Sequence, residues 1–157
     1  MQRIPRRAFL MSAGAAPLAF ALGGRAGAND RIRAAVIGMG DRGRDHVEFL
    51  SRTEGVEIAT LCDPDEHRMQ EKASEFESHG GRKPKLEPDL RRVLDDREID
   101  VITIAAPNHW HALATIWACQ AGKHVYVEKP IAHDMVEGRM IVEGLPERQQ
   151  TAGAGPG

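Results

Sequence analysis

The feature that most constrains the fold of this sequence is an apolar segment that runs directly into a glycine-spaced turn. Residues 32–38 form a near-continuous apolar run, as expected of a central parallel strand that is covered on both faces. The turn from Gly38 to Gly43 has the spacing G-x-G-x-x-G and opens into a predicted helix over residues 42–51. A strand, this turn and a helix in that order are typical of a domain that binds a dinucleotide.

Each of the three glycines has a task that a side chain would obstruct. Gly38 permits the tight turn, Gly40 lets the backbone approach a pyrophosphate, and Gly43 lets the helix pack closely on the strand. The N-terminus of the helix then offers free N–H groups and the positive end of its dipole to phosphates. Met39 lies between the first two glycines and is counted with them as a cofactor-binding position. The alternative is a turn with a purely structural role.

An aspartate at the end of the next predicted strand indicates which dinucleotide binds. The strand covers residues 56–62, and Asp63 follows it, about 20 residues after Gly43. A carboxylate at this position accepts hydrogen bonds from both hydroxyls of an adenosine ribose and repels a 2′-phosphate. The next residue is Pro64 rather than an arginine, so NAD is favoured over NADP as the cofactor. The alternative role of Asp63, capping the following helix, is compatible with this one.

The rest of the chain alternates strands and helices. Further strands are predicted over residues 101–105 and 124–128, and further helices over residues 63–78, 89–96, 111–121 and 134–143. Gly122 suits the left-handed position that closes a helix. This alternation predicts an α/β fold, a doubly wound, Rossmann-like parallel sheet with right-handed crossovers.

Composition excludes several classes of function. The chain has 21 basic and 23 acidic side chains and no long run of either sign, so neither a nucleic-acid surface nor an anionic-membrane surface is indicated. Cys62 and Cys119 cannot form a framework of disulfides, and we expect both to be small buried side chains. His109 and His111 form a pair without cysteine or carboxylate neighbours, so no metal site is predicted.

Two polar clusters follow the later predicted strands, at the edge where open α/β sheets bind ligands. In the first, Asn108 is expected to turn its side chain toward the cofactor and His111 to cap a helix. In the second, Lys129 lies between Glu128 and Pro130. A lysine there is suited to orient a substrate hydroxyl and lower its pKa as a hydride leaves. The alternative for Lys129 is a solvated surface side chain.

The first 28 residues have the features of an export signal rather than of a folded domain. They combine a basic start, a short apolar middle and a small-x-small end at Ala28, after which we expect cleavage. Arg6 and Arg7 resemble a twin-arginine signal, although Pro5 and Met11 depart from its usual pattern. The sequence therefore predicts a periplasmic or secreted protein, with no membrane contact beyond export. An uncleaved amphipathic helix is the alternative.

Together these motifs resemble the N-terminal domain of the Gfo/Idh/MocA oxidoreductases, a family that includes glucose–fructose oxidoreductase and inositol dehydrogenase. The resemblance covers about residues 31–143 and is carried by the fingerprint glycines, Asp63, and the segments Pro107-Asn108-His109-Trp110-His111, Ala121-Gly122-Lys123-His124-Val125 and Glu128-Lys129-Pro130. It implies that Lys129 is the active-site lysine and that Asp63 holds the adenosine ribose. It also implies that Pro107 and Asn108 line the cofactor, and His111 and Glu128 are counted with them.

The resemblance further implies a substrate domain that this sequence does not show. Family members continue past Glu143 into a sixth strand and an α+β domain that carries the substrate pocket and the usual dimer contacts. Residues 144–157 are rich in Gly, Ala, Gln and Pro, and we expect them to be a disordered tail produced by a disrupted reading frame. The expected organisation is an export signal over residues 1–28, a dinucleotide-binding domain over 29–143 and this tail. Such a chain would be truncated, inactive by itself and without the family's oligomer.

Three functions remain open. The first is the NAD-binding half of an oxidoreductase that acts on a sugar or polyol by hydride transfer. The second is a non-catalytic NAD-binding remnant. The third is the N-terminal half of an NAD-dependent glycosidase of the same superfamily, which oxidises its substrate transiently.

Overall fold

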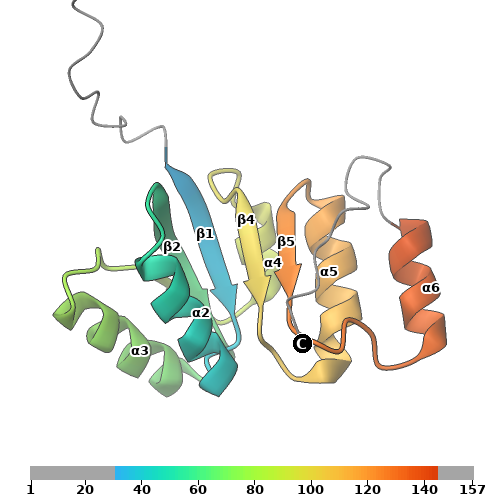
Figure 1. Cartoon of the computed structure of the whole chain (residues 1–157), viewed down its shortest axis with the longest axis horizontal. Helices are drawn as coiled ribbons and strands as arrows, with labels where there is room; N and C mark the ends of the chain where they lie inside the picture. Colours follow the sequence, from blue (N-terminus) through green and yellow to red (C-terminus); the bar gives the residue numbers. More distant parts are fainter. Residues whose placement is uncertain (1–30, 145–157) are drawn as a thin grey trace, which may run out of the picture.

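The computed structural model describes residues 31–144, which form a parallel sheet covered by helices (Figure 1). The strands are β1 (Ile32–Ile37), β2 (Val56–Cys62), β3 (Lys85–Glu87), β4 (Val101–Ile104) and β5 (His124–Val127). The helices are α2 (Asp41–Ser51), α3 (Glu66–Ser78), α4 (Leu90–Asp95), the short 3-10 helix η1 (Asn108–Trp110), α5 (His111–Gln120) and α6 (Met135–Gly144).

The five strands lie in the order β3-β2-β1-β4-β5, and every pair is parallel. β1 therefore lies in the middle, with β2 on one side and β4 on the other. Strands β2 and β3 follow β1 on one side of the sheet. The chain then crosses back, and β4 and β5 extend the sheet on the other side of β1. This reversal is the switch point at which open α/β sheets bind ligands. The doubly wound Rossmann-like fold predicted from the sequence is confirmed.

Side chains of β1 alternate between two apolar clusters, one on each face of the sheet. Ala35 and Ile37 pack with residues of α4 and α5, whereas Ala34 and Val36 pack with residues of α2 and α3. All four side chains are buried. A strand with both faces covered cannot alternate polar and apolar residues, which explains the continuous apolar run in the sequence.

Two helices begin at aspartates that cap them. The Asp65 carboxylate accepts the N–H groups of His67 and Arg68 at the start of α3, and Asp89 accepts that of Arg91 at the start of α4. The cap of α3 is thus Asp65, and the alternative role considered for Asp63 is not observed. The predicted left-handed residue after α5 is confirmed, since Gly122 has a φ of 76°.

The sequence missed one strand and misplaced several element ends. β3 is only three residues long and polar at both ends, so it carries no apolar pattern, and it forms by pairing with β2. Helix α6 extends one residue further than predicted, to Gly144. The predicted export signal and the remainder of the predicted tail lie outside the described residues.

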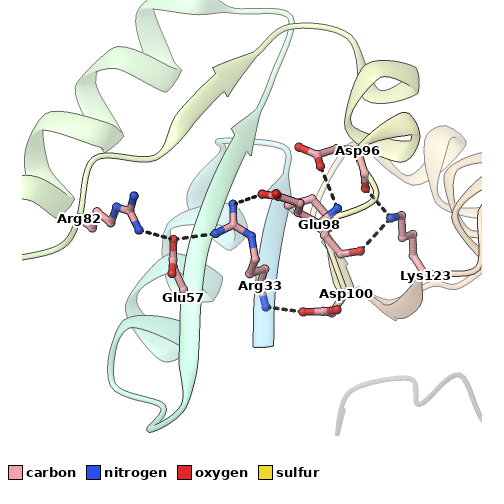
Figure 2. Close-up of polar contacts among 8 residues, drawn as sticks. Arg33, Glu57, Arg82, Asp96, Glu98, Asp100 and Lys123 are labelled. Carbon is pink, nitrogen blue, oxygen red and sulfur yellow. Dashed lines mark hydrogen bonds and ion pairs between the residues drawn. The ribbon is translucent and has the colours of Figure 1, made fainter. Parts of the chain in front are cut away.

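The amino end of the sheet is held together by ion pairs (Figure 2). The Glu57 carboxylate lies 3.1 Å from the guanidinium of Arg33 and 3.3 Å from that of Arg82. The buried amine of Lys123 donates to the carbonyl oxygens of Asp96 and Ile99, and so links the start of β5 to the turn before β4. The opposite, carboxyl end of the sheet carries the predicted site residues.

Within the described part of the chain, none of the helices has the length and apolar character needed to cross a membrane. Both cysteines are buried and unbridged, as predicted.

Candidate dinucleotide site

Four segments that carry predicted site residues leave the same edge of the sheet. The fingerprint turn follows β1, Asp63 follows β2, Pro107 and Asn108 follow β4, and Glu128 follows β5. Because all strands are parallel, their carboxyl ends meet at one edge. The fingerprint turn lies at the switch point, next to the segment after β4.

Two of the fingerprint glycines are required by the fold itself. Gly38 has a φ of 91°, and a Cβ there would lie 2.7 Å from the carbonyl oxygen of Ala105. A Cβ on Gly43 would lie 1.8 Å from the carbonyl oxygen of Gly38, so only glycine lets helix α2 approach the turn. The tight turn and the close helix packing predicted for these two positions are confirmed.

Gly40 is different, because nothing in the described chain requires a glycine there. Its backbone is extended, with φ −73° and ψ −167°, a conformation open to any residue. A Cβ on Gly40 would meet no described atom within 4 Å. Gly40 precedes the first turn of α2, and no side chain caps the N–H groups of that turn. Among the described residues, the position is therefore open space in front of backbone donors that no side chain caps, as a bound phosphate needs.

Met39 and Gly40 also line a cavity of about 300 Å³ between the fingerprint turn and helix α3. Its other lining residues are Asp41, Arg44, Arg68, Glu71 and Lys72. Met39 as a whole is 2% exposed and its side chain packs in the core, so it lines the cavity mainly by shaping the turn.

The Asp63 carboxylate is oriented by two backbone amides. Its Oδ2 accepts the N–H of Met39 at 2.7 Å, and its Oδ1 accepts the N–H of Asp65 at 2.9 Å. An ionised carboxylate has about four acceptor positions, so two remain for the hydroxyls of a ribose. Asp63 is partly exposed beside the turn, where it could hold the adenosine side of the cofactor.

The ring of His111 lies between two backbone carbonyl oxygens. The ring is 2% exposed, with Nδ1 2.7 Å from the carbonyl oxygen of Pro130 and Nε2 2.7 Å from that of Ala106. Neither ring nitrogen is left for a cofactor, and the side chain does not cap α5, because no side-chain hydrogen bond caps that helix. His111 instead connects the segment after β4 to the segment after β5.

Pro107 and Asn108 are exposed at the start of this connection, on the side of the turn away from Asp63. His109 is exposed as well. Residues 31–144 contain no group of three or more His, Cys, Asp or Glu side chains that could hold a metal ion.

Glu128 and Lys129 follow β5 and differ in their surroundings. The Glu128 carboxylate lies 3.1 Å from Nε2 of His46, and this hydrogen bond is the main cause that holds its pKa below the ordinary value. The side chain of Lys129 is exposed, and none of residues 31–144 forms a hydrogen bond or ion pair with its amine. Lys129 thus offers an exposed cation on the β5 side of this edge.

Sequence reasoning missed His46. The one available signal was its position on α2, whose buried face consists of Gly43, His46, Val47 and Leu50. A histidine among apolar residues on the buried face of a helix needs a polar partner. The sequence does not show that this partner comes from β5.

Taken together, the edge suits an extended dinucleotide. A pyrophosphate would lie at the N-terminus of α2, with the adenosine ribose at Asp63 on the β2 side. The other half would then extend over β4 and β5, toward Asn108 and Lys129. The order of the strands thus places the residue suited to the adenosine on the β2 side. The residues suited to the reacting, nicotinamide half lie on the β4 and β5 side.

Comparison with known proteins identifies the family of this domain. The model of the GFO_IDH_MocA family, described as an oxidoreductase family with an NAD-binding Rossmann fold, matches residues 32–155. A glycosyl hydrolase family 109 protein of Shewanella pealeana is 33% identical over 125 residues, which are 77% of this chain and 27% of that protein.

Solved structures show the same fold. Myo-inositol dehydrogenase from Lactobacillus casei, in complex with NAD(H) and myo-inositol, has a TM-score of 0.68 and 25% identity. The WlbA dehydrogenase from Bordetella pertussis, in complex with NADH and UDP-GlcNAcA, has a TM-score of 0.62 and 25% identity. The matched regions are 73% of this chain, 33% of the first structure and 32% of the second. The chain therefore spans about a third or less of these relatives.

Proposed function

The chain belongs to the Gfo/Idh/MocA oxidoreductases, and its NAD-binding Rossmann domain confirms NAD as the cofactor predicted from the sequence. From this premise we propose that the chain supplies the cofactor-binding half of an enzyme that oxidises a sugar or polyol by hydride transfer. Gly38, Met39, Gly40 and Gly43 are the proposed pyrophosphate turn, and Asp63 the proposed ribose acceptor.

One observation carries the proposal more than any other. Gly40 stands before N–H donors that no described side chain caps, and no described atom lies within 4 Å of the position of a Cβ. A glycine that the fold does not need, at the point where the fingerprint brings the backbone to a pyrophosphate, is explained by a ligand. Gly38 and Gly43 differ from Gly40, because the fold itself requires a glycine at both positions. They form the turn whether or not a ligand is bound.

The residues of the edge have separate tasks in this proposal. Bound NAD supplies the hydride acceptor. Asp63 accepts the ribose hydroxyls, and Pro107, Asn108 and Glu128 shape the wall beside the reacting half. The Lys129 amine donates a hydrogen bond to the substrate hydroxyl, which lowers the pKa of that hydroxyl and stabilises negative charge on its oxygen.

The proposed substrate class follows from the relatives rather than from this domain. Myo-inositol and UDP-GlcNAcA, found in the two solved structures, are both rich in hydroxyl groups. A second candidate is supported by the similarity to the glycosyl hydrolase family 109 protein. In that case the same half-site would oxidise a glycoside transiently, and NAD would be regenerated within each turnover.

An activity assay of the 157-residue chain with NAD separates the candidates. Accumulation of NADH with myo-inositol supports the oxidoreductase. Release of nitrophenol from a nitrophenyl glycoside, without net NADH, supports the glycosidase. Binding of NAD without either reaction supports a cofactor-binding chain with no turnover of its own, the outcome that the sequence predicts.

We also propose that the protein is exported by the twin-arginine route and acts in the periplasm or outside the cell. The proposal rests on the sequence of the first 28 residues, with Arg6-Arg7 near the start and Ala28 at the expected cleavage point. A protein that folds around NAD before export would carry its cofactor with it.

A further inference from the structure

Helix α2 brings an arginine to the space in front of Gly40. The backbone N–H of Arg44 donates to the carbonyl oxygen of Gly40 at 3.0 Å, which closes the first turn of the helix. Side chains of a helix lean toward its N-terminus, so this arginine extends back toward the fingerprint turn. Arg44 accordingly lines the cavity of about 300 Å³ together with Met39 and Gly40. A phosphate bound before Gly40 would therefore lie beside this side chain.

Among the described residues, three cations line this cavity, and two of them already have partners. The guanidinium of Arg68 lies 3.3 Å from the Asp65 carboxylate, and the amine of Lys72 lies 2.7 Å from the Glu75 carboxylate. The hydrogen bond from Lys72 is the main cause that lowers the pKa of Glu75, and the charge of Arg44 adds to it without a direct bond. The exposed side chain of Arg44 forms no hydrogen bond or ion pair with any of residues 31–144.

Two carboxylates also line the cavity and limit its attraction for anions. Asp41 and Glu71 are both exposed, and neither bonds to Arg44. Their charges offset much of the positive field of the three cations. The cavity therefore favours a phosphate through a direct contact rather than through a diffuse field. A guanidinium suits such a contact, because its parallel N–H groups match two oxygens of one phosphate group.

We propose that Arg44 is a further cofactor-binding residue, whose guanidinium donates two hydrogen bonds to the pyrophosphate of NAD from the side of α3. This inference rests on the proposed function, in which the pyrophosphate lies at Gly40. The fingerprint turn supplies backbone donors at the end of α2, whereas Arg44 supplies a full positive charge from the flank of the helix. Part of the affinity for NAD is then electrostatic, and salt should weaken it.

Titration calorimetry with NAD on the 157-residue chain tests this contact. Arg44→Met keeps an apolar stem without the charge and should weaken NAD binding about tenfold, the effect of one lost hydrogen bond to a charged group. The same change should reduce the salt dependence of NAD binding. Arg44→Lys keeps the charge but not the paired N–H groups, so it should recover part of the lost affinity.

Two matched arginine variants are the controls. Arg68→Met removes a cation of the same cavity that is already paired with Asp65, so it should weaken NAD binding clearly less than Arg44→Met does. Arg52→Met, at the far end of α2, removes a cation paired with Glu48 and should leave NAD affinity unchanged. Adenosine, which has the ribose but no phosphate, should bind equally to Arg44→Met and to the parent.

An NMR titration with inorganic pyrophosphate separates this inference from the proposed function. Pyrophosphate should shift the amide resonances of Gly40 and Asp41 in the parent, and about tenfold more of it should be needed in Arg44→Met. Equal NAD affinities for Arg44→Met and the parent, or equal losses in Arg44→Met and Arg68→Met, would overturn the inference and leave the proposed function standing. If the parent binds no NAD, the proposed function fails. Pyrophosphate shifts that are absent from the parent, or unchanged in Arg44→Met, would then overturn the inference as well.

Discussion

The Asp63 carboxylate accepts the backbone N–H of Met39 at 2.7 Å, which ties the end of β2 to the glycine turn after β1. The bond orients the carboxylate before any ligand arrives. A second backbone donor, Asp65, holds its other oxygen. A group that is fixed in advance loses little conformational entropy on binding, which supports the proposal that Asp63 accepts the ribose hydroxyls.

Replacing this carboxylate should weaken NAD binding and reduce the preference of the protein for NAD over NADP. In Asp63→Ala the ribose hydroxyls lose a charged acceptor, which we expect to reduce NAD affinity about 10- to 100-fold. The repulsion of a 2′-phosphate disappears with the same change, so NADP affinity should fall less or rise. Titration calorimetry with both dinucleotides measures this.

The control for Asp63→Ala is Asp65→Ala, two residues later. Asp65 caps α3, so its loss should cost about 1 kcal/mol of stability while NAD affinity stays near that of the parent. Equal NAD affinities for Asp63→Ala and the parent would contradict the assignment of Asp63.

Gly43→Ala should disrupt the fold rather than only the binding site. The added Cβ would lie 1.8 Å from the Gly38 carbonyl oxygen, so α2 and the turn must separate. We expect a loss of about 3 kcal/mol or more in the free energy of unfolding, measured by urea denaturation. A Gly43→Ala protein as stable as the parent would show that α2 does not approach the turn this closely.

The rate at which the two cysteines are alkylated should fall when NAD binds, because bound NAD stabilises the folded protein. Burial is the main cause that raises the pKa of Cys62 to about 12, and Cys119 is buried as well, so neither forms a reactive thiolate in the folded protein near pH 8. Alkylation should then require unfolding. NAD at 100 times its Kd should lower the unfolded fraction of the protein about 100-fold. The rate of alkylation should fall by the same factor.

Mass spectrometry after iodoacetamide treatment follows this reaction, and the chain in denaturant is the positive control. Rapid labelling of Cys62 in the native protein would contradict the buried position. A labelling rate that does not respond to NAD would argue against NAD binding by the folded chain.

The export proposal makes a prediction of its own. In a bacterial host, the double change Arg6→Lys, Arg7→Lys should leave the precursor in the cytoplasm, whereas the parent should be found in the periplasm and cut near Ala28. Cell fractionation with N-terminal sequencing measures both. Mature protein in the periplasm despite the double change would exclude the twin-arginine route.

Much of the fold followed from local sequence signals. The apolar run of β1 required two covered faces, and the spacing of Gly38 and Gly43 predicted a close approach that the geometry confirms. β3 was missed because three mostly polar residues form a strand only by pairing with β2.

The site was less predictable where contacts join distant segments. His46 and Glu128 are 82 residues apart in the sequence, and the local sequence around either residue does not predict that it contacts the other. For His111, the sequence indicated a polar role near the cofactor. The ring is instead enclosed by carbonyl oxygens of Ala106 and Pro130, whose positions depend on how two loops meet.

The central claim is that the fingerprint turn holds the pyrophosphate of NAD, and Gly40→Val tests it most directly. Because the backbone of Gly40 is extended and no described atom lies within 4 Å of a Cβ there, the valine should fit the fold at a cost of about 1 kcal/mol or less. The same side chain would occupy the space of the phosphates. Titration calorimetry should therefore show NAD binding by the parent and none by Gly40→Val, with thermal unfolding midpoints within a few degrees. Equal NAD affinity for the two proteins would contradict the account.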